Sequence, residues 1–509
     1  MIDRKTLRTV MMIICVTAFA VVSAFYLNKE KARCLGVEII REEQLAKLGS
    51  QMERDLSGVI MFGGQKAATD TETATVYIPQ NIKDNSLYTE FEKELASADE
   101  SCSLYFVWDD SFKDMPKAVK DGHIFRLVAA TAEGYTQYNV VFTSLPVMRV
   151  EGEVVGQNED ERDVYEGNLC LWSPKFKSTG AYNIKTSSAR WHFRGNSNYH
   201  VGKKSLKLTL LDAEGLNSDL DLIGNEYEDD DWILNALYMD DTKLREKLVM
   251  DMWNTLCDST PYNLKMSTGE YVEVVRDGRY QGLYLLENRV DGKYLELEEE
   301  QVLVKGQPGH DSTEISDHYR IIQSQYDEKL VWDRMEGLFN RDNGQYIQLD
   351  NWIDVSLFVQ LGYMTDNSNR YNAFYLIDEI EENPSIKTIL WDTDLALGIG
   401  WVDGVFTRSL EIGTTKQRYR KEDESLRKIY PDLDDMIAQR YKELRKSTFS
   451  EEYIFENIER LGAVIDSSGV MQRDEARWKT RCKGEDTREF LCQYIEARLE
   501  FLDGVYGIN

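Results

Sequence analysis

The sequence predicts an α+β protein with a transmembrane helix at its N-terminus, and three observations support this class. Short segments of alternating apolar and polar residues, typical of strands, recur between residues 35 and 290. Amphipathic helical patterns prevail from residue 351, most of all across residues 423–506. Ahead of both, residues 9–27 form an apolar run without a charge that is long enough to cross a bilayer.

Basic residues flank this apolar run. Arg4, Lys5 and Arg8 precede it, as in a signal anchor, and basic residues also follow it at positions 29, 31 and 33. The run is longer than the apolar part of a usual signal peptide, so we expect residues 1–34 to form an uncleaved anchor. This predicts a single-pass membrane protein with most of its chain outside the cytoplasm.

The net charge and the cysteine spacing exclude some kinds of binding partner and cofactor. The formal net charge of −29 repels nucleic-acid backbones and anionic membrane surfaces, so no nucleic-acid partner is expected, and membrane contact is expected only through the N-terminal helix. The seven cysteines include no CxxC pair, which argues against a zinc site and a dense disulfide framework. Cys482 and Cys492 are the first pair to check for a bridge.

Two folded regions are expected after the anchor. Residues 35–142 combine strands such as "TATVYIP" and "CSLYFVW" with helical stretches, and they contain no set of side chains that predicts chemistry. Residues 143–509 are strand-rich over 143–310 and mainly helical over 311–509. We therefore expect a small α+β domain of unknown role followed by a larger domain that carries the function.

A lysine in the stretch "HFRGNSNYHVGKKSLKLTL" is the first candidate for chemistry. If the strand alternates, Lys204 shares a face with Leu206, Leu208 and Leu210 and points toward the core. Together with Arg194 and Asn196 from the "RGNS" turn, such a lysine would suit a phosphate group. The alternative is a lysine at the start of a strand whose ammonium reaches solvent.

Glu287 in "GLYLLENR" is a second charge on an apolar face, which it shares with Leu283 and Leu285. A buried carboxylate needs a cation, so Lys204 and Glu287 are candidates for mutual pairing. Alternatively, one of the two lies at the rim of its strand.

Two later stretches offer further carboxylates. In "YMTDNSNRYNAFYL", a helix ends near Met364, Asp366 begins a polar loop, and the loop closes at Asn372, although Asx-turns alone could explain it. In "ILWDTDLALG", Asp392 and Asp394 come after a strand and could hold one hard cation, unless they are solvated or cap the next segment of the chain.

The order of these parts is that of protein-kinase-type phosphoryl transfer. A lysine holds the phosphates, a loop Asp accepts the proton of the substrate hydroxyl, and a loop Asn and a later Asp bind magnesium. The glycine-rich GxGxxG loop and the HRD and DFG strings are missing, and the spacings differ. The residues therefore indicate an unconventional kinase or none.

Several stretches together resemble the CotH family, the kinases named after spore coat protein H. They occur in the same order and cover about residues 143–506: "FTSLPVMRV", "FRGNSNYHVGKKSLKLTL", "MDDTKLREKL", "GRYQGLYLLENRVD", "TDNSNRYN" and "LWDTDLALG". The resemblance implies an atypical protein-kinase-like fold that binds ATP and Mg²⁺ and phosphorylates serine or threonine.

The resemblance also implies roles for residues of this chain. Lys204 would hold the nucleotide phosphates, with Arg194, Asn196 and Glu287 nearby, and Asp366 would be the catalytic base. The metal ligands would be Asp392, Asp394 and Asn372. The chain departs from the family pattern in the loop, where Ser368 replaces a common His, and Asn369 could serve instead of Asn372.

The predicted function is a membrane-anchored CotH-type protein kinase that uses ATP and Mg²⁺ to phosphorylate Ser or Thr of a protein substrate at the cell envelope. One alternative is a catalytically inactive CotH-like surface or scaffold protein. A glycoside hydrolase is a poorer fit, because its two carboxylates face each other about 5 to 9.5 Å apart across a groove. Asp392 and Asp394 instead lie next to each other along one segment.

Overall fold

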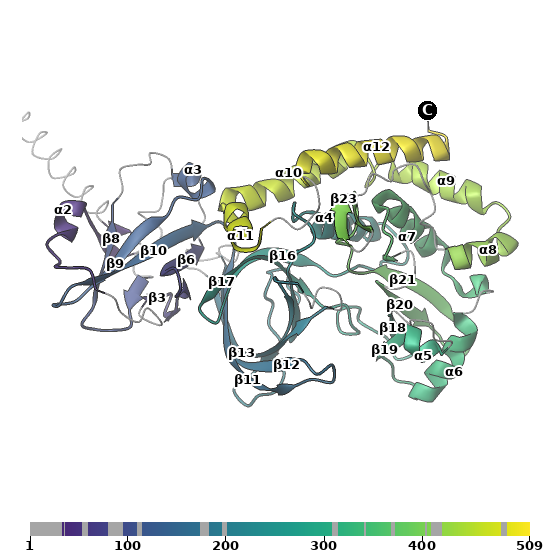
Figure 1. Ribbon diagram of the computed structural model, residues 1–509. Helices are drawn as coiled ribbons and strands as arrows, with labels where there is room; N and C mark the ends of the chain where they lie inside the picture. Colours follow the sequence, from purple (N-terminus) through teal and green to yellow (C-terminus); the bar gives the residue numbers. More distant parts are fainter. Residues whose placement is uncertain are drawn as a thin grey trace, which may run out of the picture.

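A computed structural model describes thirteen stretches of the chain. These are residues 33–34, 36–52, 60–79, 95–108, 115–173, 183–195, 201–307, 314–339, 343–367, 372–402, 405–408, 420–479 and 486–508. Figure 1 shows an N-terminal sheet, a barrel and a smaller sheet side by side, with long helices running along one side of the barrel and the smaller sheet.

The N-terminal region is built on a seven-stranded sheet in the order β1-β2-β8-β9-β10-β6-β5. Its strands are β1 (Arg33–Cys34), β2 (Val37–Ile40), β5 (Ala68–Asp70), β6 (Thr75–Pro79), β8 (Ser103–Val107), β9 (Phe125–Ala130) and β10 (Tyr135–Thr143). A three-stranded sheet and two short helices accompany it. The strands are β3 (Ile60–Phe62), β4 (Gln65–Lys66) and β7 (Leu95–Ser97), and the helices are α2 (Glu42–Leu45) and α3 (Met115–Lys120).

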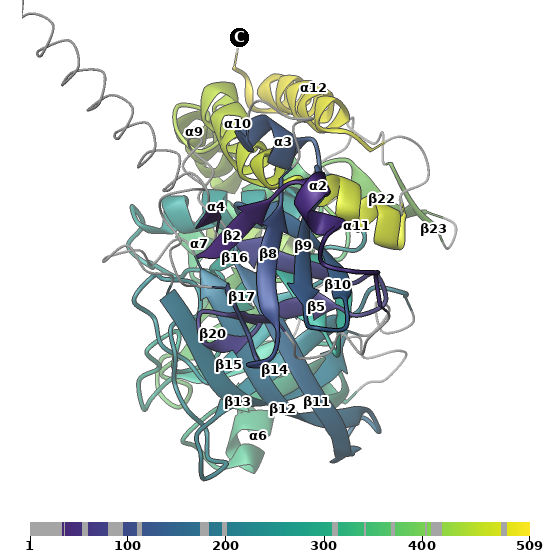
Figure 2. The ribbon, with the colours of Figure 1, turned by 90° about the vertical axis from the view of Figure 1, so that its left-hand side faces the viewer.

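This sheet packs on the barrel through a shared hydrophobic cluster, and it lies in front of the barrel in the view of Figure 2. The rings of Tyr77 and Tyr280 stack with centroids 4.4 Å apart, and the Tyr280 backbone N–H donates to Asp70 at 2.9 Å. One hydrophobic cluster includes β6 residues together with Val147 and Trp172 of the barrel. The predicted boundary at residue 142 therefore falls inside a continuous core, and domain independence stays a prediction.

Seven strands form a closed barrel in the order β11-β12-β13-β14-β15-β17-β16. They are β11 (Val147–Gln157), β12 (Asp163–Ser173), β13 (Asn183–Arg194), β14 (Ser205–Leu211), β15 (Asp231–Asn235), β16 (Gly269–Arg276) and β17 (Arg279–Asn288). Alternation in β14 buries Leu206, Leu208 and Leu210 and leaves Lys207 half-buried. Gly152 is required opposite Trp191, since a Cβ there would lie 2.2 Å from the indole ring.

The predicted protein-kinase-like fold is wrong for this strand-rich region. The parallel pairing of β11 with β16, with Val147 opposite Glu273, closes the sheet into a barrel. Strand periodicity predicts that each strand exists, but a parallel partner more than a hundred residues away leaves no local signal. The observed class is a mixed α/β structure with several sheets and one closed barrel.

The remaining sheet has the strand order β19-β18-β20-β21, and a two-stranded ribbon follows it. These strands are β18 (Val302–Gly306), β19 (Tyr319–Gln323), β20 (Ala373–Asp378), β21 (Ser385–Leu390), β22 (Ile399–Val402) and β23 (Val405–Arg408). The helices are α4 (Arg245–Cys257), α5 (Ile315–His318), α6 (Glu328–Leu338), a 3-10 turn (Gly344–Tyr346), α7 (Leu349–Gly362), α8 (Arg420–Ile429), α9 (Leu433–Leu444), α10 (Glu451–Ser468), α11 (Val470–Trp478) and α12 (Arg488–Tyr506).

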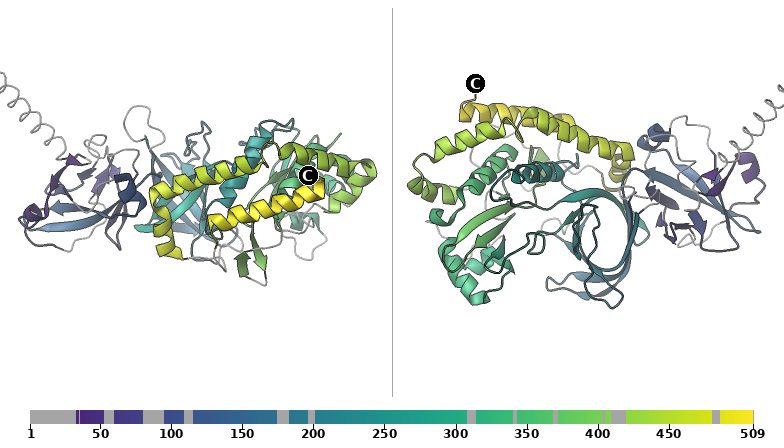
Figure 3. Two further views of the ribbon diagram at one scale, coloured as in Figure 1. Left: turned by 90° about the horizontal axis from the view of Figure 1, so that it is seen from above. Right: turned by 180° about the vertical axis from the view of Figure 1, so that it is seen from behind.

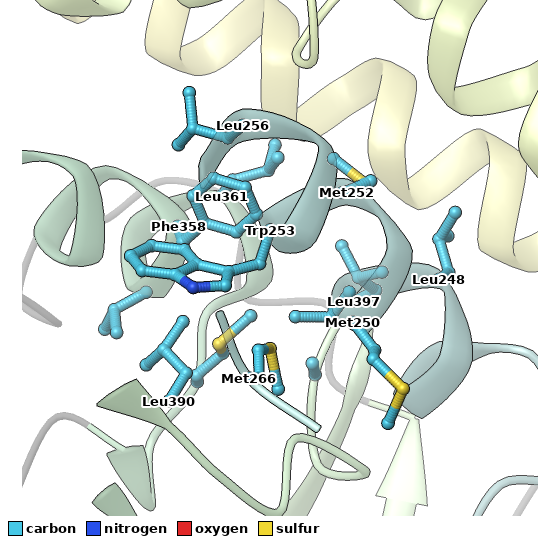
Figure 4. Close-up of a cluster of buried hydrophobic side chains, with 14 of the residues drawn as sticks. Leu248, Met250, Met252, Trp253, Leu256, Met266, Phe358, Leu361, Leu390 and Leu397 are labelled. Carbon is cyan, nitrogen blue, oxygen red and sulfur yellow. The ribbon is translucent and has the colours of Figure 1, made fainter. Parts of the chain in front are cut away.

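Helices α9 and α12 pack against α7, α10 packs against α4, and α10 and α12 lie side by side in Figure 3. In this core the rings of Trp253 and Phe358 meet edge to face, 5.1 Å between centroids. Figure 4 shows Leu390 and Leu397 in the same cluster. Because these two leucines bracket residues 391–396, the core fixes both ends of the segment that carries Asp392 and Asp394.

The prediction of a single-pass membrane protein is also corrected. Across the stretches of chain that the structure describes, none of the helices is long and apolar enough to cross a membrane. The apolar run at residues 9–27, on which the prediction depended, lies outside those stretches.

Candidate active site

Side chains from the barrel, from α4 and from the end of β21 meet at a small cavity of about 30 Å³. Each barrel residue lies at the end of a strand, so the cavity sits where the barrel opens toward the helices. The cavity is lined by Arg194, Gly195, Ser205, Asn235, Glu246, Glu287, Trp391 and Asp392.

The segment after β21 is held in an unusual backbone conformation. Asp392 has a φ of 55°, which a non-glycine residue adopts only when its surroundings enforce it. The next residue is tied down, since the Thr393 N–H donates to Glu246 Oε2 at 2.6 Å and its hydroxyl lies 3.1 Å from the same oxygen. Glu246 of α4 therefore fixes the peptide that separates Asp392 from Asp394.

The polar loop after α7 is joined to this same segment. Helix α7 ends where Tyr363 adopts a left-handed φ of 51°, and Asp366 follows shortly afterwards. The buried amide of Asn367 donates to the carbonyls of Asn372 and Trp391, both at 2.8 Å. Asp366 and Asp392, far apart in sequence, are thus brought to one place by their neighbours.

Four carboxyl groups at the site have raised pKa values. Burial, and then the charges of Glu287 and Asp392, hold the pKa of Glu246 well above its usual range. Burial raises the pKa of Glu287 to about 8, with Arg194 opposing the shift and Asp392 adding to it. For Asp394 and Asp366 the causes of the higher pKa are burial and then Asp392. Asp392 is the electrostatic centre of the cluster.

One carboxylate oxygen in this cluster lacks a partner. Glu287 is 1% exposed, and its Oε2 has no hydrogen-bond partner among the described residues. A buried oxygen of this kind is costly unless a cation or a donor meets it. Three of these carboxyl groups line the cavity, those of Glu246, Glu287 and Asp392, and carboxylate oxygens are the ligands that hard divalent cations prefer.

Two cations flank the cluster. The Arg194 guanidinium and the Lys305 ammonium each lie 5.4 Å from the centre of the Trp391 ring, and Lys305 is also 5.2 Å from the Phe374 ring. Burial, and then Arg194, lower the pKa of Lys305 to about 7, although Asp392 acts in the opposite direction. The site therefore combines an excess of carboxylates with two cations on one aromatic ring.

The structure brings together most of the predicted site residues. Arg194, Glu287 and Asp392 line one cavity, and Asp366 and Asp394 interact electrostatically with Asp392. Asn372 lies just before β20, where its carbonyl accepts from the backbone N–H of Trp391 at 3.1 Å. Asn196, Ser368, Asn369 and Cys482 lie outside the described residues.

Lys203 is the more deeply buried of the two adjacent lysines. It is 1% exposed, donates to Asp474 Oδ1 of α11 at 2.7 Å and also donates to the Leu283 carbonyl. The half-buried Lys204 places its ammonium 5.0 Å from the Phe193 ring, and Phe193 pairs with Leu206 and packs against the same core cluster. The predicted face of Lys204 therefore stays a prediction.

The proposed pairing of Lys204 with Glu287 is replaced by another contact. The cation that acts on Glu287 is Arg194, and Asn235 hydrogen-bonds the same carboxylate. The role of Lys204 in binding nucleotide stays a prediction.

Sequence reasoning missed Glu246 and Lys305. Glu246 lies off the apolar stripe of α4, which made it resemble an ordinary exposed helix residue. Lys305 shares a strand face with Leu303 in "VLVKG", the same signal that singled out Glu287, a charge on an apolar face. Only the second residue could have been found from the sequence pattern.

A tighter acidic group occurs elsewhere among the described residues. Asp219, Asp229 and Asp230 can place one oxygen each within 4.8 Å of one another. The ammonium of Lys293 already lies 2.6 Å from Asp219 and 3.9 Å from Asp229. One ammonium thus offsets part of the charge of three aspartates, whereas the ligand oxygens of the carboxyl groups around Asp392 lie farther apart than those of this group.

Carboxylates and cations are the groups with which phosphoryl-transfer sites hold metal ions and phosphates, so the residues present are compatible with a site of that class. A sequence profile described as CotH kinase protein matches residues 191–502. The match covers more than half of the chain, so the protein belongs to the CotH family, and the resemblance seen in the sequence is confirmed. No curated protein matches the chain.

The matched region contains every residue of the candidate site, from Arg194 in β13 to Asp394. The family is described as kinase proteins, which is consistent with ATP and metal use at a cluster of carboxylates and cations. The N-terminal sheet lies outside the match.

Proposed function

We propose that this protein is an ATP- and Mg²⁺-dependent protein kinase of the CotH type that transfers phosphate to Ser or Thr of a protein substrate. The observation that carries the proposal is the buried carboxylate cluster centred on Asp392, with an unpartnered Glu287 oxygen and cations at its edge. Membership of the CotH family supports it.

In this proposal Asp392 and Asp394 hold the metal, with Asn372 assisting. Their carboxylates come from one segment that Glu246 and the helical core keep in place. Bound Mg²⁺ would neutralise charge on the phosphates of ATP. Without it, the ionised carboxylates around Asp392 would repel a triphosphate.

Asp366 is the proposed base. It would accept the proton of the acceptor hydroxyl as the hydroxyl oxygen bonds to the γ-phosphorus and the bond from that phosphorus to the β-phosphate oxygen breaks. ADP then carries the leaving charge, so atoms and charge balance. The hydrogen bonds from Asn367 to the carbonyls of Asn372 and Trp391 would hold Asp366 in a fixed position relative to the metal ligands.

The first test is nucleotide-dependent stability followed by phosphate transfer. We expect ATP with Mg²⁺ to raise the melting temperature of the wild-type protein, and Asp392→Ala to abolish this rise. Asp333→Ala, at an exposed position of α6, is the matched control and should respond as the wild type does.

Transfer is then measured as autophosphorylation and as labelling of a mixed Ser/Thr peptide set. Asp366→Asn should retain the nucleotide-dependent rise in melting temperature and lose transfer. A folded wild-type protein whose melting temperature does not change with ATP and Mg²⁺ contradicts the proposal. That result would favour a scaffold protein that retains the CotH fold.

A further inference from the structure

We infer that Lys305 and Arg194, placed on Trp391, form the subsite for a phosphate group of the nucleotide. The inference rests on the proposed kinase function and names the residues that would recognise the anion. It assigns to Lys305 of β18 the role that the sequence pattern assigned to Lys204.

The two cations come from different parts of the fold and meet at one ring. Arg194 ends β13 of the barrel, whereas Lys305 lies in β18 of the smaller sheet, opposite Phe374 of β20. Both charges lie 5.4 Å from the centre of the Trp391 ring, and Trp391 is 5% exposed. Both cations therefore lie at one buried ring, where their like charges repel each other.

Neither cation is neutralised by a direct ion pair. In the described parts of the chain, no carboxylate oxygen lies within 4.0 Å of the Lys305 ammonium or the Arg194 guanidinium. Lys305 is half-buried, and an ammonium in that position without a counter-ion is stabilised when an anion binds. Two donors of this kind, one of them a guanidinium, fit the oxygens of a phosphate.

Asp392 explains why the anion would bind here only together with metal. It lines the cavity beside Arg194 and Trp391, and it also acts electrostatically on Lys305. Without metal, the carboxylates around Asp392 repel a phosphate. With metal on these carboxylates, the Trp391 cations and the metal attract the same anion from two sides.

Lys204 lacks this placement. Its ammonium lies over Phe193, its carbonyl accepts from Tyr284 at 3.2 Å, and it is not among the residues that line the cavity. The neighbouring Lys203 forms an ion pair with Asp474. Lys305 is therefore the lysine whose surroundings favour an anion.

The experiment compares three lysine variants of the full chain. Calorimetry or fluorescence anisotropy would give the Kd of ATP with Mg²⁺, of tripolyphosphate with Mg²⁺ and of adenosine for each protein. We expect Lys305→Met to weaken ATP and tripolyphosphate binding by about tenfold or more, the loss typical of one charge-assisted contact, and to leave adenosine binding unchanged. Arg194→Met should do the same.

Lys387→Met is the matched control, because Lys387 lies in β21 of the same sheet and pairs with Asp378 at 2.7 Å. It should keep the wild-type Kd for ATP. Lys204→Met is the competing variant, and loss of ATP binding there with retention in Lys305→Met overturns the inference.

The outcomes separate the inference from the proposed function. A wild-type protein that binds neither ATP nor tripolyphosphate with Mg²⁺ overturns both. A wild-type protein that binds ATP, with the same Kd in Lys305→Met, overturns the phosphate subsite alone. Melting temperatures of all variants identify misfolding, and if Lys305→Met is unfolded, Lys305→Gln takes its place with the same expected loss.

Discussion

Glu246 Oε2 accepts a hydrogen bond from the Thr393 N–H at 2.6 Å, which ties the first turn of α4 to the peptide between two site aspartates. The contact joins residues 147 positions apart, and both side chains are fully or nearly fully buried. Glu246 therefore acts on the metal site through Thr393, as a positioning residue. Its removal should change metal affinity first.

Glu246→Ala is expected to raise the Mg²⁺ concentration required for nucleotide binding by about tenfold or more, because the Thr393 N–H loses its acceptor and Asp392 is released from its positive φ. Glu246→Gln retains an acceptor and should show a smaller loss. The measurement is the Mg²⁺ concentration that gives half of the ATP-induced rise in melting temperature. Equal values for wild type, Gln and Ala variants would exclude this positioning role.

Asp392→Gly should raise the stability of the metal-free protein and abolish its response to ATP and Mg²⁺. Glycine adopts the φ of 55° without strain, and removal of the carboxylate relieves repulsion on Glu246, Glu287 and Asp394. We expect a gain of about 1 kcal/mol or more in the free energy of unfolding, from denaturant titration. Asp392→Asn removes the charge but keeps a side chain, so it separates the two effects. Lower stability in both variants would contradict this account.

The sequence identified the carboxylates better than it identified the cations. Glu287 is 1% exposed, and Leu283 and Leu285, its neighbours on the predicted face, belong to one core cluster. Lys305 and the buried Lys203 were not singled out, although Lys203 is next to Lys204 in the sequence.

The long-range parts of the site could not be predicted. Glu246 meets Thr393 only because α4 packs against the segment after β21, a relationship of tertiary packing with no sequence period. Barrel closure through β11 and β16 likewise depends on a distant parallel pair. The family resemblance supplied what periodicity could not, namely that these separate stretches form one site.

The stability of the metal-free protein should fall as the pH rises, in part through Glu287. Its pKa in the folded protein is about 8, above the ordinary value of 4.5, so its contribution to stability is complete below about pH 4.5 and is lost as the pH rises through about 8. Glu287→Gln cannot ionise. We expect it to exceed the wild type by at least about 1 kcal/mol at pH 8.5 and to approach it below pH 4.5, measured by denaturant unfolding. A difference that does not change with pH would refute the assignment.

Lys203 is expected to be structural. Lys203→Met leaves the buried Asp474 with Lys243, at 3.6 Å, as its remaining ion-pair partner in the described parts of the chain, so we expect a loss of about 3 kcal/mol in the free energy of unfolding. The adjacent Lys204→Met should cost much less, because Lys204 is half-buried at the strand end. Urea denaturation of both variants makes the comparison. Similar losses in the two variants would mean that the ion pair between Lys203 and Asp474 contributes little to the free energy of unfolding.

The N-terminal sheet should stabilise the barrel on which it packs, although it lies outside the region matched to the CotH family. Tyr77→Ala removes a ring that is 7% exposed and stacked 4.4 Å from Tyr280, so we expect it to cost about 3 kcal/mol and to lower one cooperative melting transition. Tyr77→Phe keeps the stacked ring and should melt close to the wild type. If instead Tyr77→Ala lowers only a separate early transition and leaves nucleotide-dependent melting unchanged, the sheet is an independent domain and its core contacts with β17 do not support the site.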